Sequence, residues 1–112
     1  MIMPAAEHLT HVMKTLADPT RRAVFERIMA EREVTAGSLV ARSRVSQPAV
    51  SQHLKALRDA GLVSERKEGR HIHYRVRREG FEPLVNWLDR WSVFWNERFD
   101  NLEKYLEQEK KG

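Results

Sequence analysis

The side chains best suited to recognition chemistry lie within the stretch SRVSQPAVSQHLKALRDAGLV, residues 43–63. On a helical projection Ser51, Gln52 and Lys55 point away from the apolar positions, and Gln47 stands at the leading end. Glutamine can form two hydrogen bonds with adenine, serine contacts bases less specifically, and lysine suits guanine or phosphate. These residue types at this spacing predict a helix that reads the edges of DNA bases.

A helix from Gln47 to about Ala60 is predicted to carry these side chains. Ser46 is a typical N-cap, Pro48 is tolerated in the first turn, and Gly61 can adopt the left-handed conformation that ends a helix. Three residues at helical spacing should face the core, namely Val50, Leu54 and Leu57. The full set of residues predicted to contact DNA from this helix is Ser46, Gln47, Pro48, Ser51, Gln52, His53, Lys55 and Arg58.

A shorter helix is predicted directly before it, from Ala36 to Arg42, with Thr35 as the N-cap and Leu39 and Val40 inward. Two short helices joined by a tight turn, the second presenting small polar side chains, describe a helix-turn-helix over about residues 35–61. The second helix of such a motif can enter the major groove N-terminus first. Its N-terminus also favours a phosphate group.

The apolar period changes after residue 61. The segments LVSERK and HIHYRV can pair as short antiparallel strands, with the half-buried face formed by Ile72, Tyr74 and Val76. This hairpin, about residues 62–77, is predicted to grip phosphates or the minor groove through Arg66, Lys67, Arg70 and His71.

Charge supports a polyanionic partner. The chain carries a net charge of +4, and residues 34–80 hold ten basic and four acidic residues, a local net charge of +6. The segments on either side are neutral and slightly acidic. Basic residues can simply keep a protein soluble, but a local excess favours a nucleic-acid partner.

Two helices are predicted before the helix-turn-helix. The first runs from about Ala5 to Leu16. The second follows Asp18, an N-cap, and Pro19, and ends near Arg32. Its residues expected to face the core are Val24, Phe25, Ile28 and Met29.

A long helix is predicted at the C-terminus, over about residues 81–110. Its apolar residues cover an arc of about 180°, wider than one packed face needs. We therefore expect one face to pack on its own domain and another on a second subunit. The predicted dimer interface comprises Leu9, Val12, Trp91, Trp95, Phe99, Leu102 and Leu106.

The segments LADPTRRAVFERI, SQPAVSQHLKALRDAGLV and ERKEGRHIHYRV, in this order, resemble the ArsR family of winged helix-turn-helix repressors over roughly residues 15–76. The resemblance implies a homodimer in the bacterial or archaeal cytoplasm that binds operator DNA and often leaves it when an effector binds. It also implies that Gln47, Ser51 and Gln52 face the bases and that the hairpin is the wing.

The sequence departs from the metal-sensing members of that family. It contains no cysteine, and the C-terminal helix contains no histidine, so we expect neither a metal nor another cofactor. His8 and His11, or His71 and His73, could chelate a metal by their spacing. Exposed or interfacial histidines, and a phosphate contact by His71, are the favoured interpretations. His53 borders the buried face of its helix, which favours a structural role over base reading.

The predicted fold is mainly α with a small β-hairpin: one winged helix-turn-helix domain over residues 1–112, with the terminal helices forming a dimer interface. The predicted function is a cytoplasmic, homodimeric repressor that binds an inverted-repeat operator in double-stranded DNA. The sequence shows no catalytic motif and no membrane-spanning run. The alternatives are a winged-helix interaction module without DNA binding and a metal-responsive repressor with histidine and carboxylate ligands.

Overall fold

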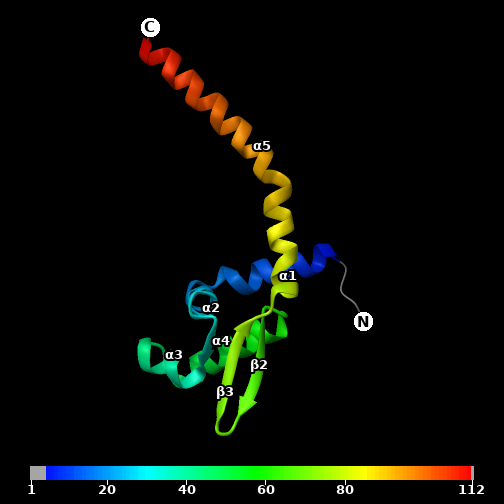
Figure 1. Cartoon of the computed structure of the whole chain (residues 1–112), viewed down its shortest axis with the longest axis vertical. Coiled ribbons are helices and arrows are strands. Elements are labelled where there is room, and N and C mark those ends of the chain that lie inside the picture. Colours follow the sequence, from blue (N-terminus) through cyan, green and yellow to red (C-terminus); the bar gives the residue numbers. More distant parts are fainter. Residues whose placement is uncertain (1–4, 112) are drawn as a thin grey trace.

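The computed structural model describes residues 5–111, which form five helices and a three-stranded sheet (Figure 1). In chain order these elements are α1 (Ala5–Ala17), α2 (Pro19–Glu31), β1 (Glu33–Thr35), α3 (Ala36–Arg42), α4 (Gln47–Asp59), β2 (Val63–Glu68), β3 (His71–Val76) and α5 (Arg78–Lys111). The helix-turn-helix, α3 and α4, is followed by the β2–β3 hairpin, called the wing below. This is the predicted winged helix-turn-helix architecture.

Side-chain caps begin three of the helices, as the sequence predicted. The Asp18 carboxylate accepts a hydrogen bond of 2.9 Å from the backbone N–H of Arg21, and this bond lowers the pKa of Asp18. Thr35 caps α3 in the same way. Gly61, with φ of 76°, follows α4 and turns the chain toward β2.

The core lies where α2, α3 and α4 meet the inner face of the sheet. Its largest fully buried side chains include Phe25, Ile28, Leu39, Leu54 and Leu57. The Phe25 ring also contacts Phe81 of α5, with the ring centroids 5.5 Å apart. The core therefore fixes the orientation of α4 and anchors the start of α5.

Two predicted positions are wrong. Met29 is 41% exposed and lies outside the core, because α2 buries a narrower face than its apolar pattern indicated. Val12 is 0% exposed and belongs to the core of its own chain. It therefore has no surface to offer a second subunit, and of the two α1 residues predicted for a dimer interface only Leu9 remains partly exposed.

The sheet has a third strand that the sequence did not predict. β1 pairs antiparallel with β3, with Val34 opposite Tyr74 and Glu33 opposite Arg75, so that the strand order is β1-β3-β2. Three residues are too short to show a period of two. The strand forms because β3 offers it an edge, and Arg32, with φ of 66°, redirects the chain out of α2.

Helix α5 begins beside α1 and then projects beyond the rest of the chain (Figure 1). It starts at Arg78, earlier than the predicted 81, with Pro83 inside the helix. Its first turn passes close to the turn after α4: a Cβ atom at Gly80 would collide with the carbonyl group of Gly61. Phe81 and Leu84 pack against the core, and no helix within residues 5–111 is long and apolar enough to cross a membrane.

Candidate nucleic-acid interface

Helix α4 presents its polar face to solvent. Ser46 caps the helix by accepting a hydrogen bond of 3.3 Å from the N–H of Ala49. Val50, Leu54 and Leu57 are almost completely buried and hold the opposite face against the core. The predicted groove-facing side chains are all exposed: Gln47, Pro48, Ser51, Gln52 and Lys55. This face is free to approach the base edges in a major groove.

His53 lies apart from this exposed face. It is half-buried, and its Nδ1 atom is buried without a hydrogen-bond partner in the described part of the chain. Asp18, the cap of α2, lies near it. The burial of His53 favours the structural interpretation over base reading.

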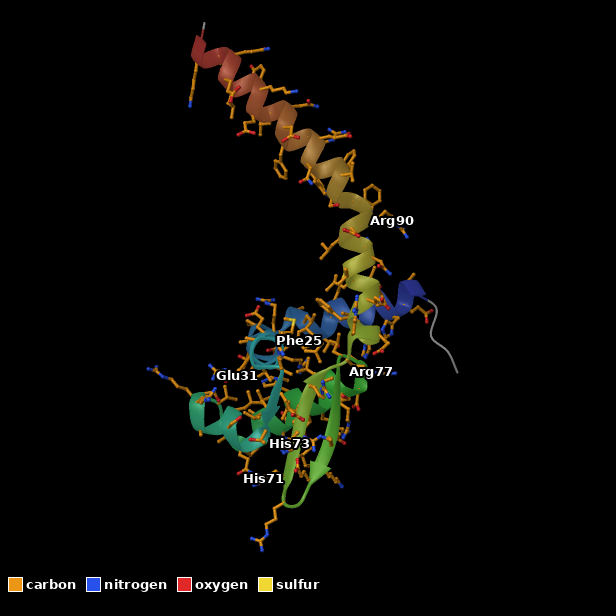
Figure 2. All side chains as sticks on the ribbon, in the orientation of Figure 1. Phe25, Glu31, His71, His73, Arg77 and Arg90 are labelled. Carbon is orange, nitrogen blue, oxygen red and sulfur yellow. The ribbon has the colours of Figure 1, made fainter. Side chains whose placement is uncertain are left out.

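The wing carries exposed cations at its tip. Gly69, with φ of 60°, makes the turn between β2 and β3, and Arg70 follows it. Lys67, Arg70 and His71 are exposed, and none of the three has an ion pair within residues 5–111. Figure 2 shows His71 and His73 along the wing. These side chains are available for phosphate contacts.

Arg66 has a different environment from that of the other wing cations. Its guanidinium donates hydrogen bonds of 2.9 Å to Glu33 and 2.7 Å to Glu68. The bond from Arg66 holds the pKa of each carboxyl below its ordinary value. Arg66 was predicted to contact a phosphate. Its partner Glu33 lies on the strand that the sequence did not predict, and its other partner, Glu68, lies two positions away in β2.

Arg58, also predicted to contact DNA, is engaged as well. Its guanidinium donates a hydrogen bond of 3.1 Å to Glu65 of β2, and Asp59 lies 3.5 Å away. The bond to Glu65 raises the pKa of Arg58. Thus α4 and the wing are joined by a charged contact near the C-terminal end of α4.

A second exposed surface runs along α5 and is apolar. Trp91, Trp95, Phe99, Leu102 and Leu106, the apolar stripe of α5, are 44–63% exposed. The rings of Trp95 and Phe99 lie 6.3 Å apart. So large an apolar patch on a small protein is typical of a protein–protein contact.

A groove of about 560 Å³ continues this surface between α1 and α5. It is lined by Ala6, Leu9, Pro83, Asn86, Trp87 and Arg90. Arg90 is labelled on α5 in Figure 2, far from the wing.

Both histidine pairs that could chelate a metal by their spacing lie within the described chain. His8 Nε2 lies 3.3 Å from the carbonyl oxygen of Gly80, and the rings of His71 and His73 are 6.5 Å apart. Within residues 5–111 no three His, Cys, Asp or Glu side chains are grouped as metal ligands would be.

Comparisons with known proteins agree with this geometry. A helix-turn-helix domain family matches residues 16–66. The HTH-type transcriptional regulator Rv2034 of Mycobacterium tuberculosis is 38% identical over 96 residues, covering 86% of each chain. The transcriptional repressor SdpR of Bacillus subtilis is 29% identical over 80 residues, 71% of this chain and 88% of its own. The solved structure of an ArsR-like transcriptional regulator from Rhodococcus sp. RHA1 has 30% identity and a TM-score of 0.69, covering 88% of this chain and 92% of its own.

The fold, the exposed α4 face and the basic wing define a winged-helix DNA-binding transcriptional regulator. The chain belongs to the ArsR family of winged helix-turn-helix repressors, as its sequence motifs predicted.

Proposed function

We propose that the protein is a homodimeric repressor that binds an inverted-repeat operator. The observation that carries the proposal is the α4 face, where a capped helix N-terminus and exposed Gln47, Ser51 and Gln52 stand beside a wing with exposed cations at its tip. In this proposal the three polar side chains read base edges in the major groove. Lys67 and Arg70 contact the phosphate backbone or the minor groove.

The apolar stripe of α5 supports the dimer. Burying one large apolar side chain contributes roughly 1.5–3 kcal/mol, so several such residues can hold two subunits together at micromolar concentration or below. Leu9 of α1 lies in the groove beside Trp87 of α5 and extends the same surface. A twofold axis through this surface presents two identical recognition helices, which is why the operator should be an inverted repeat.

Repression follows from occupancy: a dimer seated on a promoter blocks the polymerase. In this proposal the protein works in the cytoplasm, where the chromosome lies, and it has no catalytic role. The relatives named as a repressor and a transcriptional regulator support this assignment.

The test is selection of genomic fragments by the purified protein, followed by footprinting. We expect protection of an inverted repeat whose half-site centres lie about one helical turn, ~10 base pairs, or a small multiple apart. Sedimentation should show a particle of about twice the 13.2 kDa chain mass. Tight binding of a single asymmetric half-site by a monomer would contradict the proposal, and enrichment of no fragment would favour an interaction module instead.

A further inference from the structure

Two neighbouring residues of β2 hold the wing from opposite sides. Successive side chains of a strand point to opposite faces of the sheet. Glu65 pairs across the strands with Tyr74, which is buried on the core side, so Glu65 faces α4. Arg66 pairs across the strands with His73 and therefore faces the other side.

On the inner face, Glu65 joins the wing to the recognition helix. The Arg58 guanidinium donates to the Glu65 carboxylate at 3.1 Å, although the two residues belong to different elements, α4 and β2. The bond thus ties the wing to the element that carries Gln47 and Gln52.

On the outer face, Arg66 joins β2 to β1. It donates to Glu33 of β1 at 2.9 Å and to Glu68, the last residue of β2, at 2.7 Å. His73 of β3 lies beside both carboxylates, 3.9 Å from Glu33 and 3.6 Å from Glu68. One guanidinium therefore links β2 of the wing to the strand before α3, and also contacts the carboxylate at the end of β2.

We infer that Arg58 and Arg66 are positioning residues that set the distance between the recognition helix and the wing tip. The two ion-pair groups, Arg58–Glu65 and Glu33–Arg66–Glu68, are called the wing clamp below. With the clamp closed, Lys67 and Arg70 meet the DNA at a fixed offset from the bases read by α4. This inference rests on the proposed function and assigns two predicted phosphate contacts a different role.

The wing clamp predicts a change in operator affinity opposite to the one usually expected when an acidic residue is neutralised. Neutralising an acidic residue near a polyanion normally strengthens binding by removing repulsion. If Glu33 and Glu65 position the wing, Glu33→Gln and Glu65→Gln should instead weaken operator binding, by about two- to fivefold, the range that exposed ion pairs usually contribute. The matched control is Glu26→Gln on α2, whose exposed carboxylate has no ion pair within residues 5–111. It should leave the affinity equal to or slightly above that of the wild type.

Arg66 itself is tested by its salt dependence. Arg66→Gln should weaken operator binding without changing the slope of log affinity against log salt concentration. The double variant Glu33→Gln/Arg66→Gln should bind no more weakly than the weaker-binding of the two single variants. Lys67→Gln, which removes a free cation, should lower the slope by about 0.9 if it contacts one phosphate.

Trimming the duplex separates positioning from general destabilisation. On full-length operator DNA, obtained by the selection described above, Glu33→Gln should bind more weakly than the wild type. On a duplex shortened to the base pairs under the recognition helices, the two proteins should bind equally, because the wings then have no DNA to contact. Unfolding of the variant would instead reduce binding to both duplexes.

The outcomes are distinct. Tighter or unchanged binding by Glu33→Gln, or a loss of about one unit of salt slope in Arg66→Gln, would overturn the wing clamp and return Arg66 to the phosphate contacts. An equal loss on both duplexes would also overturn it. Wild-type protein that binds no duplex specifically would refute the proposed function itself.

Discussion

Helices α4 and α5 are both amphipathic, but they expose opposite kinds of surface. α4 buries Val50, Leu54 and Leu57 in the protomer and leaves polar side chains in water. α5 packs only its first turns against the core, through Phe81 and Leu84, and leaves its later aromatic residues exposed. A polar face is stable in water and needs no protein surface to cover it before DNA is bound. An apolar face as large as that of α5 favours being covered by another protein surface.

The difference separates two sources of function. A single chain is enough to position the polar face of α4, because the buried residues and the N-cap that orient this helix all belong to the same chain. We expect the α5 surface to act in an assembly, as the proposed dimer interface. Variants of α5 should therefore act through subunit association, whereas variants of α4 should act through folding or base recognition.

Removing the distal part of α5 should have the largest effect. Truncation after Arg90 keeps Phe81 and Leu84 but deletes the whole apolar stripe, so we expect a monomer that no longer binds its operator specifically. Sedimentation and a gel shift measure the two losses, and the thermal transition shows whether the helix-turn-helix still folds. Truncation after Glu107, which removes only polar residues and the final glycine, is the control and should behave as the wild type. Full operator affinity in the shorter protein would break the comparison.

Two single substitutions should sharpen the comparison between α4 and α5. Leu54→Ala opens a cavity in the core and should lower the free energy of unfolding by about 2–5 kcal/mol at every protein concentration. Trp95→Ala removes a side chain that is 53% exposed in the protomer and should weaken the dimer instead. Its effect on denaturant unfolding should therefore depend on protein concentration. A concentration-independent loss in Trp95→Ala would place this residue in the protomer's own stability.

The next largest effect is expected from a substitution on the exposed face of α4. Gln52→Ala should leave the unfolding free energy nearly unchanged, because the side chain is exposed, but should weaken binding by about 1–3 kcal/mol at the base pair that it contacts. Competition among operators that differ at single positions measures the change in preference. A uniform loss for all sequences would show that Gln52 contacts the backbone.

The smallest effect is expected at the wing tip. Arg70→Ala should weaken all sequences alike and lower the salt slope by about one unit if the side chain contacts one phosphate. Titrations at several salt concentrations test this. An unchanged affinity and slope would remove the wing tip from the interface and leave recognition to α4 alone.

Much of this architecture could be predicted from local chemistry. The caps at Asp18, Thr35 and Ser46, the glycine after α4 and the alternation of Ile72, Tyr74 and Val76 each depend on a few neighbouring residues. Such signals survive in a sequence because a helix end or a strand face is decided within a few positions. The exposed face of α4 followed from the same reasoning.

Other features depended on which surfaces meet in three dimensions. The sequence by itself determined the helices, the hairpin, the exposed polar residues of α4 and the family. The tertiary structure alone decided that Val12 is buried and Met29 exposed, since equal apolarity does not reveal which face finds a partner. It also created β1, because a three-residue strand exists only where another strand offers its edge. From the sequence, Arg58 and Arg66 were predicted to contact DNA. Folding brings Glu65, 7 positions from Arg58, and Glu33, 33 positions from Arg66, within hydrogen-bond distance of them.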